Sequence, residues 1–433
     1  LVKMKRLMGI EYRIALGVLH DEVETRGYRF DHLNSEVLNS PRVSVKDGKV
    51  CIQDGGEYRV IKLRGSERMT METATTLEKL VKAGAVICGN KPQYSPTLMD
   101  GPEDEAEVQR IADALWGPGP SGVKRTGKGR VYWGMSFRKI MAAEQIEPDV
   151  TFPKGLNLSW IHRKIGDADV YFLYSGSERE LGVSVSFRIE GKVPEIWDPM
   201  TGEQRRAGVW NREGNRTNVA LRFDPNGSAF VVFSPGKANP AVTKLMHEAK
   251  VVLDSDPGWF DSPQGMETIK QAFDSERNGE GRGQFLGPVR KAAAEVDGDT
   301  FTAWEAGGFL LQNSAGKSRK IETDHATSIT LDGSWKVSFE PGWDTPDSIE
   351  LEELKPLSEH ADQAVMYYSG TATYEKQFTL RDADGPIHLD LGEVAVIAEV
   401  WCNGRKAGTR WAPPFGFDLS TFVRPGKNRL TVK

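Results

Sequence analysis

Two patterns of hydrophobic positions divide the chain near residue 150. In the first part, short apolar runs alternate with longer segments whose apolar residues recur at helical spacing. The predicted elements are strands at 58–65, 85–89 and 129–134 and helices at 69–84 and 103–117. Strands separated by helices of this length indicate a parallel sheet. We therefore predict a flavodoxin-like α/β domain over residues 1–150.

From residue 151 the period changes to two, which is typical of antiparallel strands. The segments 158–177, 180–199 and 217–235 alternate polar and apolar residues and are separated by Asp-Pro, Asn-Gly and Gly-Lys turns. This predicts an antiparallel β-sandwich over residues 151–236. An irregular β and linker region is expected at 237–324, with strands at 248–254 and 307–313 and a Gly-rich loop at 275–286.

The last segment, residues 325–433, is again all β. Predicted strands lie at 334–341, 370–380, 386–394, 398–411 and 428–433. Asn403-Gly404 supplies the positive φ angles that a tight hairpin turn demands. We interpret this segment as a jelly-roll sandwich that stops in the middle of a strand.

Composition excludes several classes of protein. The 433 residues carry a net charge of -5, with basic and acidic residues interleaved, so nucleic acid and membrane surfaces are not expected as partners. No apolar run reaches the roughly 20 residues that span a bilayer, and the chain is expected to be soluble. Its three cysteines lie far apart and predict neither a zinc site nor a disulfide framework.

Two motifs in the first domain resemble functional sites, a dinucleotide-binding loop and a nucleophilic cysteine, but the residues around each motif do not support that function. Gly117, Gly119 and Gly122 match a dinucleotide-binding pattern, but a helix precedes them and a basic loop follows, the reverse of what that fingerprint needs. The domain also resembles the glutamine-amidotransferase-like fold, in which a nucleophilic Cys follows a strand. Cys88 holds that place, but no accompanying base is evident, so a structural domain is predicted.

Candidate sugar-binding residues occur in the sandwich. His162 and Arg163 lie beside Trp160 on an aromatic strand, where hydrogen bonds, charge and a stacking surface could meet a sugar. The plainer interpretation is a strand end with a His satisfied by a neighbour. Asp167 and Asp169 could offer oxygen ligands to calcium, but two carboxylates are too few to predict a metal site, and turn chemistry explains them.

The jelly roll offers a second set of candidates. Trp401, Asn403, Trp411 and Phe415 lie in or near predicted loops, where a lectin-like domain presents aromatic rings to carbohydrate. Of these, Asn403 and Trp411 are the predicted binding residues, and burial in the sandwich is the alternative for the others. Glycoside hydrolysis needs two opposed carboxylates, and no eightfold βα pattern presents such a pair, so catalytic residues remain unknown.

Several stretches together resemble the α-L-rhamnosidases of glycoside hydrolase family 106, over about residues 26–433. They are GYRFDHLNSEVL (27–38), VSVKDGKVCIQDGGEYRVIKL (43–63), AGAVICGNKPQYSPTL (83–98), ADALWG (112–117), WIHRKIGDADVYFLYS (160–175), FRIEGKVPEIWDPMTGE (187–203), GSAFVVF (227–233), YYSGTATYEKQF (367–378), LDLGEVAVIAEVWCNGRKAG (389–408) and RWAPPFGFDLS (410–420). The last three segments are shared more widely with sugar-binding domains of β-glycosidases. The ordered combination is more specific than any one stretch.

The resemblance implies a larger glycosidase that removes terminal α-linked L-rhamnose with inversion. Its (β/α)8 catalytic barrel is expected upstream of Leu1, and this chain is expected to be the C-terminal, accessory portion, inactive alone. Residues 1–25 match the family poorly, because the strand expected in this region can be assigned only to residues 12–22. His162 and Arg163 fall on the family's His-Arg pair, which we expect at the edge of the cleft.

The remaining expectations follow from the same resemblance. The partner is a rhamnose-containing glycan or glycoside, no cofactor is expected in this chain, calcium is possible in the parent enzyme, and the location is expected to be extracytoplasmic. An alternative is a carbohydrate-binding module or a structural spacer of another large, β-galactosidase-like glycosidase. Linkage, aglycone and oligomeric state are not indicated by the sequence.

Overall fold

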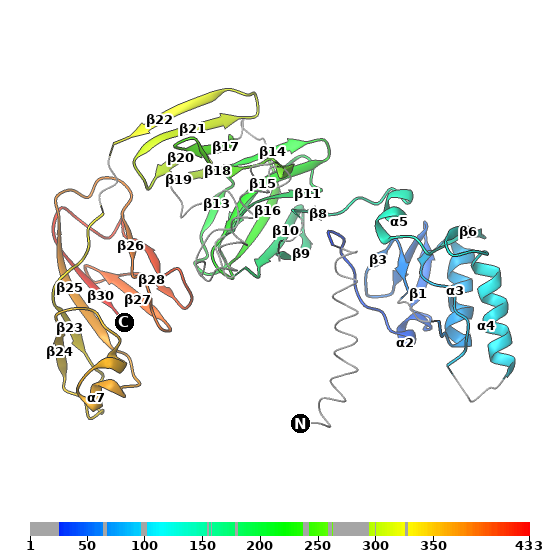
Figure 1. Cartoon of the computed structure of the whole chain (residues 1–433), viewed down its shortest axis with the longest axis horizontal. Helices are drawn as coiled ribbons and strands as arrows, with labels where there is room; N and C mark the ends of the chain where they lie inside the picture. The colour runs from blue at the N-terminus through cyan, green and yellow to red at the C-terminus, as the bar shows by residue number, and fades with distance from the viewer. Residues whose placement is uncertain are drawn as a thin grey trace. The chain divides into compact units, whose positions relative to one another are not determined.

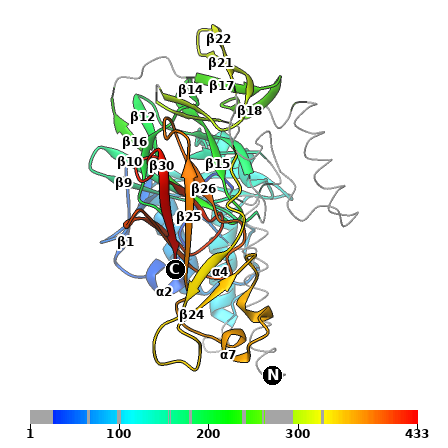
Figure 2. The same cartoon turned by 90° about the vertical axis from the view of Figure 1, so that its left-hand side faces the viewer.

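The protein folds as two compact units, over Leu1–Thr151 and Phe152–Lys433. The computed structural model (Figures 1 and 2) describes residues 26–63, 67–96, 102–153, 156, 158–177, 181–236, 242–258, 262, 294–298, 300–324 and 328–433. The predicted strand at 12–22 and the predicted loop at 275–286 lie outside these residues. The four predicted domain bounds stay predictions.

The described residues of the N-terminal unit form four helices and two small sheets. Its helices are α2 (Ser35–Leu38), α3 (Met71–Ala83), α4 (Pro102–Leu115) and α5 (Phe137–Ala143). Its strands are β1 (Val43–Lys46), β2 (Lys49–Ile52), β3 (Glu57–Tyr58), β4 (Ile61–Lys62), β5 (Val86–Cys88), β6 (Gly122–Thr126), β7 (Gly129–Trp133) and β8 (Val150–Thr151). Strands β1, β2 and β3 form an antiparallel meander.

The sheet beside α3 and α4 has the order β4-β5-β7-β6 and is mixed. β4 with β5 and β5 with β7 pair in parallel, as the strand–helix alternation predicts. β6 is antiparallel to β7, which corrects the basic loop predicted after Gly122. Gly127, with φ of 59°, turns the chain between these two strands, a conformation that glycine adopts readily. The flavodoxin-like assignment of this unit stays a prediction.

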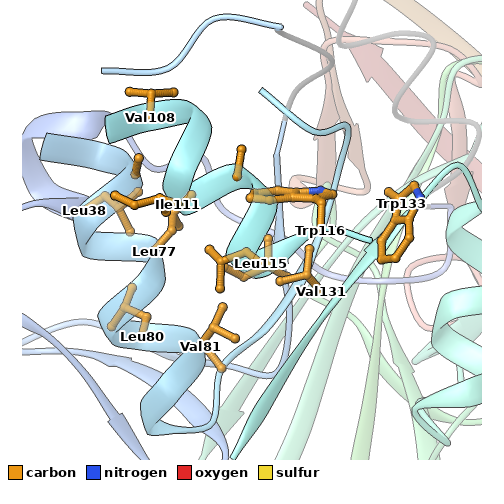
Figure 3. Packing of buried hydrophobic residues seen from close by; sticks show 14 of the residues in the cluster. Leu38, Leu77, Leu80, Val81, Val108, Ile111, Leu115, Trp116, Val131 and Trp133 are labelled. Carbon is orange, nitrogen blue, oxygen red and sulfur yellow. The ribbon is translucent and has the colours of Figure 1, made fainter. Parts of the chain in front are cut away.

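The core of the N-terminal unit lies between α3, α4 and the mixed sheet (Figure 3). Leu77, Leu80 and Val81 of α3 meet Ile111 and Leu115 of α4, as helical spacing of apolar residues requires. α3 begins where the Thr70 hydroxyl accepts a hydrogen bond from the Thr73 amide, and it ends at Gly84 with φ of 129°. The capping residues at the two ends of α3 and its buried apolar face therefore indicate the same helix.

The glycines of the GPGPSG segment have a packing role. A Cβ atom at Gly122 would lie 2.6 Å from the Trp133 ring, and one at Gly117 would lie 2.8 Å from the same ring. The Trp133 indole also donates a hydrogen bond to the Gly119 carbonyl at 3.1 Å. These glycines make room for a nearly buried indole, labelled in Figure 3. The spacing that resembles a dinucleotide fingerprint is therefore explained by packing.

The C-terminal unit begins with a β-sandwich. Its strands are β9 (Leu158–Ile165), β10 (Ala168–Ser175), β11 (Leu181–Phe187), β12 (Lys192–Trp197), β13 (Gln204–Arg206), β14 (Trp210–Glu213), β15 (Arg216–Phe223) and β16 (Ser228–Pro235). One sheet has the order β13-β12-β16-β10-β9, and β14, β15 and β11 lie side by side in the other. β9 is therefore an edge strand.

Aromatic rings join the two sheets of the sandwich. Tyr171 of β10 and Phe233 of β16 both meet Phe187 of the facing strand β11, with ring centroids 4.8 and 5.1 Å away. All three side chains are fully buried. Edge-to-face contacts of this kind add to the free energy gained by burying apolar area.

The middle of this unit is a four-stranded antiparallel sheet with a separate hairpin. The strands are β17 (Val242–His247), β18 (Lys250–Asp254), β19 (Ala294–Asp297), β20 (Thr300–Ala303), β21 (Gly307–Asn313) and β22 (Ser318–Thr323). The sheet order is β18-β17-β21-β22, and β19 pairs with β20. The strands predicted at 248–254 and 307–313 correspond to β18 and β21.

The C-terminal β-domain, residues 328–433, carries a six-stranded antiparallel sheet and a two-stranded one. Its elements are β23 (Trp335–Ser338), β24 (Ser348–Leu351), η2 (Leu357–Glu359), α7 (Gln363–Met366), β25 (Thr373–Leu380), β26 (His388–Asp390), β27 (Ala398–Cys402), β28 (Arg405–Arg410), β29 (Gly416–Asp418) and β30 (Gly426–Val432). The larger sheet has the order β24-β23-β25-β30-β27-β28, and β25 and β30 lie side by side in both Figures 1 and 2. This segment is mostly β, as predicted, with η2 and α7 as short helical elements, and its assignment as a jelly roll stays a prediction.

We expect Leu77→Ala to lower the free energy of unfolding of the N-terminal unit by about 2–5 kcal/mol. Leu77 is 0% exposed and lies between α3 and α4, so its truncation leaves a cavity. Hydrogen–deuterium exchange of α3 and β5 measures the change within this unit. Lys79→Ala, on the exposed side of the same helix, is the matched control, and equal protection in the two variants would contradict the assigned core.

Candidate functional site

The candidate site lies at the edge strand β9 of the sandwich. Side chains alternate along a strand, so Trp160 and His162 point to the inner side of the sheet while Arg163 points to the outer side. His162 lies opposite Tyr171 of β10, and Trp160 lies opposite Leu173. The predicted pair of His162 and Arg163 is therefore divided between two faces, although the Arg163 guanidinium donates a hydrogen bond to the His162 carbonyl at 3.1 Å.

His162 is held in one orientation by two contacts. Its ring stacks on the Tyr171 ring, with centroids 4.0 Å apart and planes 13° apart. Its Nε2 atom lies 2.9 Å from Oδ1 of Asp169. A carboxylate only accepts hydrogen bonds, so the imidazole donates through Nε2. The tautomer and the ring plane of His162 are both set by β10.

Asp169 is the centre of this arrangement. Its side chain is 11% exposed, and its second oxygen, Oδ2, accepts a hydrogen bond from Nζ of Lys192 at 2.6 Å. The same ammonium donates to the Asp167 carbonyl. Strands β9, β10 and β12 are thereby joined through one carboxylate. We call His162, Asp169 and Lys192 the Asp169 triad.

The Asp169 triad keeps its carboxylate ionised. Burial on its own raises the pKa of Asp169, but hydrogen bonds and positive charge from Lys192 and His162 outweigh it, so the pKa lies below the ordinary aspartate value. A carboxylate that is ionised and bound to two donors is a poor proton donor at neutral pH. The arrangement therefore suits positioning of a polar ligand by His162 rather than acid catalysis.

The same contacts argue against a calcium site at the GDAD turn. Both oxygens of Asp169 already accept hydrogen bonds from nitrogen donors, whereas Ca²⁺ requires six to eight oxygen ligands. Across the described residues, no group of three or more His, Cys, Asp or Glu side chains has the geometry to hold a metal ion. The residues at this turn do not fit calcium.

Asn403 is used inside the C-terminal β-domain. It adopts φ of 51° at the hairpin between β27 and β28. Its amide nitrogen donates to the Phe422 carbonyl and to Asn428, and its amide oxygen accepts from the Arg429 amide. The hairpin turn was predicted, and the structure adds that this side chain also ties β30 to the loop before it. A ligand-binding role for Asn403 stays a prediction.

The other aromatic candidates of this domain differ in exposure. Trp411 follows β28 and is 56% exposed, whereas Phe415 is buried in the domain core. Trp401 lies between the ammonium groups of Lys406 and Lys433, which are 5.9 and 5.6 Å from its ring. Trp411 is thus the candidate that presents its ring to solvent, and its role stays a prediction.

Lys192 and Tyr171 are residues of the site that the sequence analysis missed. Lys192 begins β12, which is separated from β10 in the sheet by β16, so its approach to Asp169 depends on strand order. Tyr171 appeared only as an apolar position of the strand. The signal that could have indicated it is the alternation that places Tyr171 on the same face as Asp169.

Cys88 and Cys402 both lack the surroundings of a nucleophile. Cys88 is buried at the end of β5, and its carbonyl accepts a hydrogen bond from the Leu63 amide. Burial raises the pKa of the Cys402 thiol, which disfavours the reactive thiolate.

Among the described residues, no helix is both long and apolar enough to cross a membrane.

Comparison with known proteins gives a consistent picture. A family profile described as alpha-L-rhamnosidase matches residues 17–210. The solved rhamnosidase from Novosphingobium sp. PP1Y superposes with a TM-score of 0.68 at 27% sequence identity, over 94% of this chain and 32% of that protein. This chain is similar to the α-L-rhamnosidases of glycoside hydrolase family 106. The family resemblance predicted from its sequence motifs is confirmed.

A curated relative from Formosa agariphila is 26% identical over 561 residues, and its name assigns it provisionally to the beta-glucuronidases. The match covers 95% of this chain and 47% of the relative. The chain therefore spans less than half of the length of either protein. The two names disagree about the sugar but agree on glycosidase chemistry, so a glycosidase-like class is the common conclusion.

We expect Asp169→Asn to lower the free energy of unfolding of the C-terminal unit by about 1–3 kcal/mol near neutral pH, because two charge-assisted hydrogen bonds weaken. The folded-state pKa of Asp169 is lowered. Its contribution is therefore present above the unfolded value of about 3.9 and is lost as pH falls through the folded value. Urea unfolding at about pH 7 and about pH 3 measures both effects.

The control for this prediction is Asp167→Asn, which removes an exposed carboxylate from the same turn. We expect it to change stability by less than about 0.5 kcal/mol. A difference between Asp169→Asn and the unmodified chain that stays constant down to the lower pH would contradict the assignment of an ionised Asp169.

Proposed function

We propose that this chain is the C-terminal, accessory portion of a larger glycosidase that acts on terminal α-L-rhamnose of glycans or glycosides. The observation that carries the proposal is the similarity to a solved rhamnosidase along 94% of this chain and only 32% of that protein. A (β/α)8 barrel upstream of Leu1 would supply the catalytic acid and base. Calcium, where it is used, would belong to that upstream part.

The sheets of this chain support an accessory role. A catalytic barrel of this class needs eight parallel strands that present carboxylates at one end. None of the sheets formed by the described residues has more than six strands, and the six-stranded one is antiparallel. The Asp169 carboxylate, held by Lys192 and His162, has no opposed acid in the triad.

In the proposed enzyme, the edge strand β9 borders the substrate cleft. His162 is fixed by Asp169 and Tyr171, so its imidazole can meet a sugar hydroxyl without losing further side-chain freedom. Trp160, half-buried on the same face, offers an apolar ring surface beside it. Arg163 on the outer face would serve a different contact. A location outside the cytoplasm belongs to the same proposal.

We expect this 433-residue chain to give no turnover of an aryl α-L-rhamnoside, because the opposed acids are supplied upstream. The measurement is release of the aryl group by the purified chain, next to a longer protein that adds the upstream barrel. Turnover by the longer protein alone is the expected result. Robust hydrolysis by the chain itself would show that the catalytic centre lies within these residues.

In the longer protein, we expect His162→Gln to raise KM by about 2- to 10-fold with little change in kcat, since one ligand hydrogen bond is worth about 0.5–1.5 kcal/mol. Ser159→Ala, an exposed position on the same strand, is the matched control. Unchanged KM in His162→Gln would remove β9 from the cleft. A fall in kcat alone would instead assign His162 to the chemical step.

A further inference from the structure

A cluster of aromatic side chains lies at one end of the C-terminal β-domain, where two loops meet. Trp343 lies in the turn between β23 and β24, and Tyr367 and Tyr368 follow α7. Trp343 is 48% exposed and Tyr367 is 75% exposed. In both Figures 1 and 2, α7 lies beside β24. We call Trp343, Tyr367 and Tyr368 the Trp343 cluster.

Tyr368 holds this cluster together. Its ring packs edge-on against Phe339 and Trp343, with centroids 4.9 and 5.3 Å away. Its hydroxyl accepts a hydrogen bond from the Glu340 amide at 3.1 Å and donates one to the Thr371 carbonyl at 3.0 Å. The turn after β23 and the loop after α7 are therefore joined through one phenol.

A small hydrophobic core lies under the Trp343 cluster. Val337, Phe339 and Val365 are buried together, and Ile349 and Tyr368 pack against them. This core is separate from the larger one around Trp335, so the loops have a packed base of their own. Exposed rings on a packed base lose little conformational entropy when they bind, which favours a recognition surface.

Charge around the Trp343 cluster restricts what it can bind. Residues 339–371 contain eight acidic side chains and one basic side chain, Lys355, which pairs with Glu353. Glu340, Asp344 and Asp347 are exposed. Such a surface repels anions, and its carboxylates are strong acceptors for hydroxyl groups. A ligand with hydroxyls, an apolar face and no negative charge matches these properties.

We propose that the Trp343 cluster is a second carbohydrate-binding surface, which stacks the apolar face of a neutral sugar chain on Trp343 and Tyr367 while nearby carboxylates accept its hydroxyls. This inference rests on the proposed glycosidase function for its choice of carbohydrate. It places this second surface at the loops around β23, β24 and α7, apart from the predicted candidates Trp411 and Asn403. The surface would hold a polymeric substrate close to the enzyme.

The experiment is calorimetric titration of the full chain with a neutral α-L-rhamnan hexasaccharide. We expect Trp343→Ala and Tyr367→Ala each to weaken binding by about tenfold or more, as removal of a central aromatic contact does. Val396→Ala, the control at an exposed apolar side chain of the same domain, should stay within about twofold of the unmodified chain. An oligogalacturonate of equal length should bind more weakly than the neutral chain.

Three results would overturn the proposal: no binding by the unmodified chain, unchanged binding in both cluster variants, or an equal loss of binding in Val396→Ala. Tyr367→Ala guards against a folding artefact because that side chain is three-quarters exposed, and near-ultraviolet circular dichroism checks each variant. Hydrolysis of an aryl α-L-rhamnoside by the longer protein is independent of this surface. If only the binding surface is wrong, the glycan titration fails while the longer protein still hydrolyses the aryl rhamnoside. If the proposed function is wrong, the hydrolysis itself fails.

Discussion

The β-sandwich depends on the pairing of one buried carboxylate, Asp169, with Lys192 and with His162 of the edge strand β9. Asp169 is largely buried, and an unpaired carboxylate there would cost far more free energy than a typical contact returns. Lys192 and His162 satisfy its two oxygens from two other strands. Because an edge strand has only one neighbour, this side-chain bond also fixes how β9 lies against β10. The orientation of His162 follows from it.

Side-chain alternation decided much of what could be predicted. Period-two segments located the sandwich strands, and helical spacing located α3 and α4, because each pattern matches a face that must be buried. It could not indicate the order of strands within a sheet. Lys192 reaches Asp169 across β16, a non-local contact that no local pattern encodes. For the same reason His162 and Arg163 looked like one pair, although adjacent strand residues point apart.

Motifs proved informative only together with their surroundings. The glycine spacing of GPGPSG follows a helix and leads into an antiparallel hairpin, and the glycines accommodate the Trp133 ring. Asn403 was expected from turn chemistry, and its side chain is used by the hairpin itself. The Trp343 cluster was missed because Trp343 and Tyr367 lie in different loops, 24 positions apart in the chain. The contacts of Tyr368 with Trp343 and with the Glu340 amide help to bring these loops together.

Electrostatics bears on which sugar the protein meets. A glucuronic acid residue carries a carboxylate and is usually recognised by Arg or Lys. Beside β9, the ammonium of Lys192 from β12 is already matched by Asp169, while the exposed guanidinium of Arg163 lies on the outer face of β9. Near the Trp343 cluster most of the charged residues are acidic. Neutral rhamnose needs no cation and presents a methyl group that favours contact with aromatic rings. The charges near the Trp343 cluster therefore fit the neutral sugar that is proposed to bind there.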